Sequence, residues 1–200
     1  MTPQTPYTAD LAGREPVSAM RDTTARIRAV AGDWRPDEFE RSYAPGKWDA
    51  RKILIHLAQS EVALGYRARM TLTSPGYLAQ NFDQDQWMLI EAGGAGRSGR
   101  PGGAGGSGGS GLPADLSAEA VAKAEARSAK AGGCSGHDAL DAFLGLAAMN
   151  IALFASLSDA DRAITLSHPE YGSLTIDWII HQMAGHQIHH LGQLDEIATR

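Results

Sequence analysis

The sequence is poor in cysteine, poor in aromatic residues and without a long apolar run. Its one cysteine, Cys134, excludes an internal disulfide framework and a cysteine-based zinc site. The most apolar stretch runs from Phe143 to Leu157, contains Asn150, and falls short of the roughly 20 residues that a membrane span needs. The first ten residues lack the basic and apolar regions of a signal peptide. We therefore expect a cytoplasmic protein without a membrane partner.

Positive charge is also scarce, because 18 lysines and arginines face 23 acidic residues and give a net charge of −5. An acidic chain repels phosphate backbones and anionic lipid, so we expect no nucleic-acid partner. Alternating patterns typical of strands are absent as well. What remains is a helical pattern, with apolar residues at spacings of three and four in four blocks, at about 16–30, 48–71, 137–157 and 174–198.

These blocks predict an all-α fold, an antiparallel four-helix bundle with a long connection between helices two and three. The alternative is another small all-α fold. Pro16 suits an early helical position and Asp49 suits an N-cap, while residues 74–76 and 169–172 contain turn signals. Residues 1–92 and 134–200 are expected to form this single bundle.

The long connection contains most of the excess glycine. Residues 81–92 include four large apolar side chains that we expect to pack on the bundle: Trp87, Met88, Leu89 and Ile90. Eleven of the 23 glycines lie between Gly93 and Gly111, which predicts a flexible linker, and residues 117–131 predict a short Ala-rich helix. We consider two origins for residues 93–133: inserted or engineered material, since GGSGGSG resembles a laboratory linker, and a natural glycine-rich loop.

Four of the seven histidines fall within ten residues of the last block, and helical geometry separates them. At about 100° per residue, His186 and His190 lie on or beside the apolar stripe, whereas His181 and His189 lie off it. Two imidazoles at i and i+4 can bind one metal ion. Structural, hydrogen-bonded core histidines are the alternative.

His56 is the candidate for a third ligand. It lies in the middle of the second block among Ile53, Leu54 and Leu57, where a lone histidine can also be an ordinary core residue. Periodicity does not decide which way it faces, because this block is apolar on several sides. In an antiparallel bundle its middle lies level with the latter part of the last block, and three neutral histidines would leave coordination positions open.

Three motifs resemble the DinB-like superfamily, which is related to metal-dependent thiol-S-transferases. They are a Trp-containing helix start with His56, Leu57 and Glu61; the string Phe82, Asp83, Asp85 and Trp87; and the closing pattern Gly185, His186, His189, His190, Leu191 and Gln193. The resemblance implies a four-helix bundle, often a homodimer, with a divalent metal (Zn, Ni, Fe or Mn) on His56, His186 and His190. The chain departs from it in the Gly-rich segment and in residues 146–149, where an Arg is common in the family.

An open three-histidine metal site is suited to hydrolysis or to transfer of a low-molecular-weight thiol onto a small-molecule substrate. Both use an exogenous nucleophile, which suits a chain without a nucleophile motif. Glu61, His189 and Gln193 are candidates for orienting the ligands, although Glu61 could instead form an ion pair; Tyr66 and Arg67 could reach a pocket mouth. The alternative function is a non-catalytic, metal-stabilised binding or scaffold protein, or an engineered host for the inserted segment.

Overall fold

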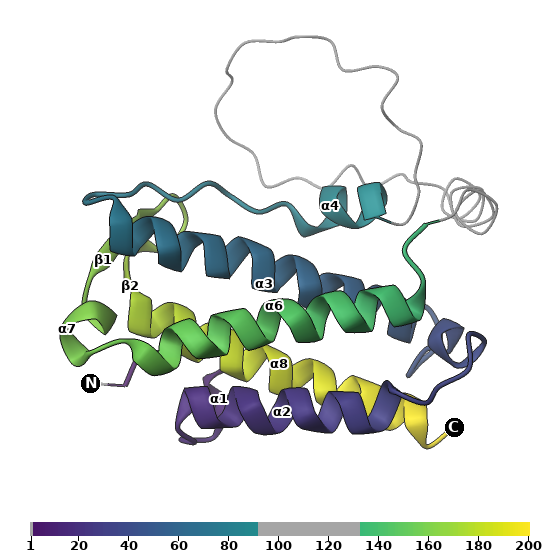
Figure 1. Cartoon of the computed structure of the whole chain (residues 1–200). Coiled ribbons are helices and arrows are strands. Elements are labelled where there is room, and N and C mark those ends of the chain that lie inside the picture. The colour runs from purple at the N-terminus through teal and green to yellow at the C-terminus, as the bar shows by residue number, and fades with distance from the viewer. Residues whose placement is uncertain (1, 92–132) are drawn as a thin grey trace, which may run out of the picture.

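Four long helices make up the body of the computed structural model, which describes residues 2–91 and 133–200 (Figure 1). They are α2 (Pro16–Ala31), α3 (Ala50–Thr73), α6 (Gly136–Ser156) and α8 (Ile176–Ala198). Each coincides with one predicted block, and a four-helix bundle is confirmed. The shorter elements are α1 (Thr8–Leu11), η1 (Glu38–Glu40), α4 (Gln84–Glu91), α7 (Asp159–Arg162), β1 (Thr165–His168) and β2 (Gly172–Thr175).

The helices begin at capping residues. Pro16 occupies the first turn of α2, where its missing N–H leaves no hydrogen bond unmade. Asp49 caps α3 by accepting a hydrogen bond from the backbone N–H of Lys52, as predicted. Thr175 caps α8 by accepting one from the N–H of Trp178, so this helix begins two residues after the predicted Leu174.

The long helices pack as two parallel pairs, with α3 against α6 and α2 against α8. In Figure 1, α3 and α6 run in one direction while α2 and α8 run in the other, so the long connection joins two parallel helices. Among the described residues, α6 alone has the length and composition to cross a membrane; here it packs against α3 and α2 and buries Phe143 and Phe154, whereas Met149 is exposed. The core between the pairs includes Leu54, Leu57, Phe143, Ile179 and Met183, all fully buried.

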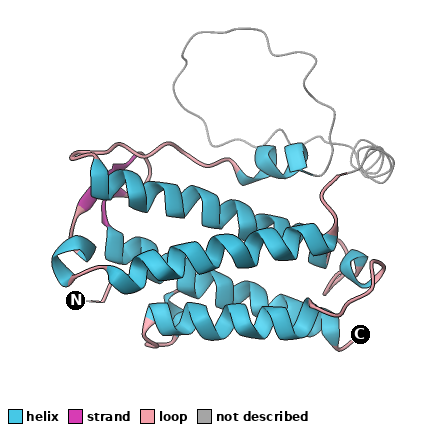
Figure 2. Cartoon of the chain, in the orientation of Figure 1, coloured by secondary structure: helices cyan, strands magenta, loops and turns pink. Residues whose placement is uncertain are grey.

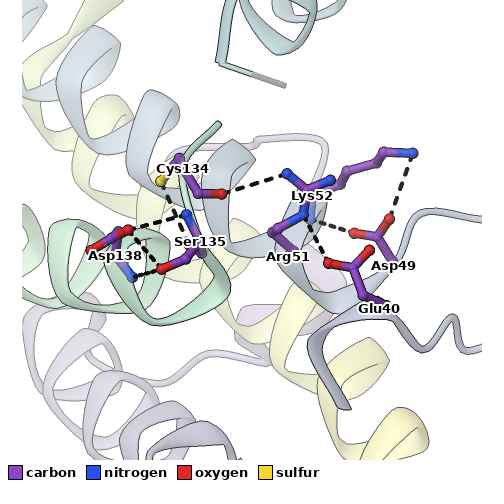
Figure 3. A network of polar contacts seen from close by, with 7 residues as sticks. All are labelled: Glu40, Asp49, Arg51, Lys52, Cys134, Ser135 and Asp138. Atoms are coloured by element: carbon purple, nitrogen blue, oxygen red, sulfur yellow. Dashed lines mark hydrogen bonds and ion pairs between the residues drawn. The ribbon is translucent and has the colours of Figure 1, made fainter. Parts of the chain in front are cut away.

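Polar contacts join the starts of α3 and α6 (Figure 3). Ser135 and Asp138 form a capping box at the start of α6. Arg51 of α3 donates to the carbonyl oxygen of Cys134 at 3.5 Å and pairs with Glu40 at 3.2 Å. These contacts attach the residues that follow the Gly-rich segment to the beginning of α3.

The expectation of no strands is wrong over eight residues, which form the β1–β2 hairpin, drawn in magenta in Figure 2. Only Leu166, His168 and Leu174 are buried in it, so the alternation was too short to detect. The segment 77–79 adds to β1: the N–H of Ala79 donates to the carbonyl of Ser167 at 2.8 Å, and the N–H of Ser167 donates to the carbonyl of Tyr77 at 3.0 Å. The predicted turn at 169–172 connects the two strands.

The packing predicted for residues 87–90 is confirmed for one side chain and wrong for three. Met88 of α4 is buried, whereas Trp87, Leu89 and Ile90 are exposed, because an eight-residue helix lying on α3 has one face to bury. The predicted linker and Ala-rich helix in residues 93–133 lie outside the described residues, apart from Gly133.

Candidate metal centre

Three histidines from two helices meet in the core. His56 of α3 lies 2.9 Å from His186 of α8, and His190, one turn further along α8, lies 3.0 Å from His186, each distance joining two Nε2 atoms. All three side chains are buried, and their candidate ligand atoms lie within 4.8 Å of one another. The structure therefore brings together the three residues that the sequence predicts as ligands.

Hydrogen bonds alone do not satisfy this cluster. The Nε2 atom of His186 lies within hydrogen-bonding distance of two other Nε2 atoms, but a neutral imidazole nitrogen carries either one proton or one lone pair. It can therefore serve one neighbour at a time. A single cation accepts all three lone pairs at once, and bonds of about 2.0–2.1 Å to Zn²⁺ would put neighbouring nitrogens about 3.3 Å apart. The donor set fits a divalent ion.

The environment keeps the three rings neutral, which is the form that binds metal. Burial, with a smaller contribution from His190, lowers the pKa of His56 to about 3. Burial also lowers the pKa of His190 to about 4, against a hydrogen bond to Gln193 that raises it. The pKa of His186 is also lowered, first by burial and then by the neighbouring histidines.

Gln193 orients one of the three rings. Its Oε1 atom accepts a hydrogen bond from His190 Nδ1 at 2.8 Å, which leaves the Nε2 lone pair of His190 facing the cluster. The amide nitrogen of Gln193 donates to His189 at 3.3 Å, and His189, which is exposed, pairs with Asp10 at 3.4 Å. Gln193 and His189 thus lie behind His190, where the sequence predicts orienting residues.

Glu61 lies elsewhere. Its carboxylate is buried and accepts hydrogen bonds from the side-chain amides of Asn150 in α6 at 2.8 Å and Gln187 in α8 at 2.7 Å. It contacts none of the three histidines, nor does it form an ion pair, within the described residues. Both expectations for it are wrong, because five residues along α3 turn it away from His56. Burial raises the pKa of Glu61 to about 7, although these two hydrogen bonds act to lower it.

Aromatic rings enclose the cluster. The ring of Trp48 meets that of His56 edge-on with centroids 5.2 Å apart, and the ring of Tyr7 meets His186 in the same way at 5.0 Å. Tyr7 comes from the N-terminal segment that crosses α8 at Gly185, where an added Cβ would lie 2.5 Å from the carbonyl oxygen of Tyr7. The glycine permits this crossing, and Tyr7 thereby covers His186.

A pocket of about 210 Å³ opens onto the cluster and is lined by His56 and His186. Its other polar walls include Ser60, Arg67, His168, Glu170, Tyr171 and Gln182. Arg67 thus reaches the pocket as predicted, whereas Tyr66 does not line it and is exposed. A second hollow of about 270 Å³ approaches His190 and Gln193 from another side, beside Trp48.

The sequence analysis missed the hairpin residues of this pocket. His168 ends β1 and is buried, and the turn that follows it carries Glu170 and Tyr171. The available signal was a histidine directly before the turn 169–172, but nothing in the sequence placed that turn beside α3. Tyr7 was missed for the same reason, since its contact with His186 spans most of the chain.

Comparisons with known proteins identify a family and a similar fold. The family model described as the DinB superfamily matches residues 19–194. Two proteins of Oceanobacillus iheyensis, whose names propose metal-dependent hydrolases, are similar to this chain. OB0782 is 22% identical over 184 residues, which cover 92% of this chain and 84% of that protein. OB0413 is 27% identical over 66 residues, which cover 33% of this chain and 38% of that protein. In fold the chain resembles YfiT from Bacillus subtilis, described as a probable metal-dependent hydrolase with an unusual four-helix bundle topology, with a TM-score of 0.64, 16% identity, and coverage of 92% and 85%.

Proposed function

The chain belongs to the DinB superfamily, and from that premise we propose that it is a metal-dependent hydrolase whose His56, His186 and His190 hold one divalent ion. The observation that carries the proposal is the convergence of three neutral, buried Nε2 atoms beside a pocket. The donor set is suited to Zn, Ni or Fe, and Mn is the fourth candidate. The names of the similar proteins support hydrolysis as the reaction class.

The residues around the pocket favour an exogenous nucleophile. A divalent ion bound there supplies a Lewis acid that lowers the pKa of water toward neutrality. Ser60 lines the same pocket, but its hydroxyl makes no hydrogen bond to a histidine in the part of the chain described. Cys134 lies at the start of α6, outside the residues that line the pocket. The protein's contribution is therefore to hold the ligands, orient His190 through Gln193 and confine a small-molecule substrate.

Transfer of a low-molecular-weight thiol is the second candidate reaction. The pocket walls formed by the described residues supply no activated nucleophile, which favours this reaction too, since a thiol could occupy the place of water at a three-histidine ion. The two reactions differ in the incoming nucleophile alone. Product analysis with and without added thiol separates them.

Elemental analysis of the purified protein tests the proposal. We expect about one divalent ion per chain in the wild type, and a small fraction of that in each of His56→Ala, His186→Ala and His190→Ala. His181→Ala is the matched control, since His181 lies on the same helix but bonds the backbone carbonyl of Asp177. Full metal content in His190→Ala would contradict the assignment.

Chelation tests catalysis against the non-catalytic alternative. A catalytic ion is expected to leave a helical, cooperatively melting protein when it is removed, with hydrolysis of a panel of small esters and amides abolished and then restored by the metal. If the ion is purely structural, the metal-loaded protein should hydrolyse none of these compounds. The family resemblance also implies a homodimer, which light scattering of the purified protein tests.

A further inference from the structure

Two opposite charges line the pocket without pairing with each other. Arg67 of α3 and Glu170 of the hairpin turn both line it, and neither takes part in an ion pair within 4.0 Å in residues 2–91 and 133–200. The guanidinium of Arg67 donates to the carbonyl oxygen of Gln80 at 2.6 Å, and Glu170 accepts from the side-chain amide of Asn81 at 3.1 Å. Each charge is thus held by a neutral group and remains available to a ligand.

Both charges are fixed in position by the frame around them. The backbone N–H of Glu170 donates to Nδ1 of the buried His168 at 3.2 Å, and β1 is bonded on its other edge to residues 77–79. Burial lowers the pKa of Arg67, whereas Tyr77, Glu170 and Tyr171 raise it, so the carboxylate of Glu170 is within electrostatic reach of the guanidinium. The pocket therefore presents one positive and one negative group, each positioned by a hydrogen bond to a neighbouring residue, near the histidine cluster.

A ligand with one charge does not suit this pocket. A simple anion is attracted by Arg67 and repelled by Glu170, and a simple cation meets the reverse. A ligand that carries a carboxylate and an ammonium group satisfies both through charge-assisted hydrogen bonds. Tyr171 also lines the pocket, and its ring lies between those of His168 and Trp178, with centroids 5.0 Å and 5.6 Å away.

We infer that the pocket selects a small zwitterion of the amino-acid class, with its carboxylate on Arg67, its ammonium group on Glu170 and its third substituent directed to the histidine cluster. This rests on the proposed function, because the third substituent binds at the metal. The volume agrees with a small ligand, since about 210 Å³ is below the roughly 300 Å³ at which pockets for drug-sized molecules begin.

Four thiols that share a mercaptoethyl unit and carry these charges in different combinations test the inference on the full chain loaded with Co²⁺. L-Cysteine carries both charges, 3-mercaptopropionate the carboxylate, cysteamine the ammonium group and 2-mercaptoethanol neither. Thiolate-to-cobalt absorption reports the binding of each, so the readout needs no enzymatic activity. The variants are Arg67→Gln and Glu170→Gln, with Arg28→Gln, an exposed arginine of α2, as the control.

The informative quantity is a ratio of affinities compared between variants, because the four thiols differ in their own acidity. We expect Arg67→Gln to reduce the preference for L-cysteine over cysteamine about tenfold, which corresponds to about 1.4 kcal/mol. Glu170→Gln should reduce the preference for L-cysteine over 3-mercaptopropionate by a similar factor. Neither variant should alter the affinity for 2-mercaptoethanol, and Arg28→Gln should alter no ratio.

Unchanged ratios in both pocket variants, with a normal 2-mercaptoethanol band, would overturn the zwitterion pocket and leave the metal site standing. Failure of the wild type to bind cobalt would instead overturn the proposed function. In that case a titration with L-alanine, propionate and ethylamine decides the inference separately, read by the difference in tryptophan fluorescence between the wild type and Trp178→Phe, since Trp178 lines the pocket. Equal binding of the three would then refute it.

Discussion

Replacing Glu61 by glutamine is expected to make the protein more stable at neutral pH. The carboxylate of Glu61 is buried between Asn150 and Gln187, and burial raises its pKa from 4.5 to about 7. A glutamine has the same shape and no charge. Its carbonyl can accept from Asn150, and its amide can donate to Oε1 of Gln187, a buried atom that has no hydrogen-bond partner, once the Gln187 amide turns over.

The magnitude follows from the two pKa values. A difference of one between the folded and unfolded pKa corresponds to 1.36 kcal/mol, so the difference between 4.5 and about 7 corresponds to about 3 kcal/mol. Between these pH values the folded protein keeps a proton that the unfolded chain has lost, so ionisation of Glu61 lowers the free energy of unfolding as pH rises. The cost is absent below pH 4.5 and complete above about pH 7.

Urea unfolding of both proteins, followed by circular dichroism at a series of pH values, measures the effect. The difference between variant and wild type is the useful quantity, because His56, His186 and His190 titrate in the same range. Because the pKa values of these histidines are lowered in the folded protein, the unfolded chain binds protons at a higher pH than the folded one. Stability therefore falls below pH 6.5 by the same amount in both proteins. We expect the stability of Glu61→Gln relative to the wild type to rise by about 3 kcal/mol between pH 4.5 and pH 7.

Glu196→Gln is the matched control, since Glu196 is an exposed residue of α8. Its stability difference from the wild type should stay within about 0.5 kcal/mol at every pH. A stability difference for Glu61→Gln that does not change with pH would refute the assignment of the raised pKa to this residue. A decrease toward neutral pH would show that the carboxylate stabilises the fold.

Two further predictions concern the surroundings of the cluster. Gly185→Ala should displace the N-terminal segment, because the new Cβ would lie 2.5 Å from the carbonyl oxygen of Tyr7, and we expect a loss of about 1–3 kcal/mol in urea unfolding and faster proteolysis near Tyr7. The control Gly192→Ala, with open space around it in the same helix, should leave that proteolysis unchanged and raise the free energy of unfolding by about 0.5–1 kcal/mol. Gln193→Leu removes the acceptor for His190 Nδ1 and should weaken metal binding about 10–100-fold in a competition titration with a chelator; unchanged affinity would show that Gln193 does not orient the ring.

The long helices were predictable because their signals are local. Apolar spacing and caps such as Asp49 lie within a few residues of the structure they specify. The directions of the helices were less accessible. Nothing local indicates that α3 and α6 run parallel, since that arrangement depends on the long connection between them and on packing across the bundle.

The histidine pair on α8 was predictable for the same local reason. The angular position of His186 and His190 relative to the apolar stripe identifies the buried face of one helix, and both are buried. The direction in which His56 faces was not, since α3 is buried on several sides; the family resemblance was needed to include it. Glu61 shows the limit of reasoning from spacing, because a carboxylate five residues after His56 points to other neighbours, Asn150 and Gln187.

The pocket walls were not predictable from sequence spacing. Four-residue strands give too few alternating positions to distinguish them from a loop, and β1 is held partly by hydrogen bonds to residues 77–79, about ninety positions earlier in the chain. His168 and Glu170 depend on those contacts. Pairing between distant segments thus determined which residues surround the candidate metal centre.

The contact between α3 and α8 buries the histidine cluster and the carboxylate of Glu61 side by side. The cluster helps to explain how the fold tolerates the buried carboxylate. His56 faces His186, and Glu61 faces the next residue, Gln187. Buried polar groups destabilise a fold unless each finds a partner. Protons cannot satisfy all three histidines, whereas a bound ion can, and ligand at 1,000 times its dissociation constant adds about 4 kcal/mol to stability. At that metal concentration the gain would be comparable to the cost of about 3 kcal/mol at Glu61, so metal bound at the histidines would offset the neighbouring carboxylate.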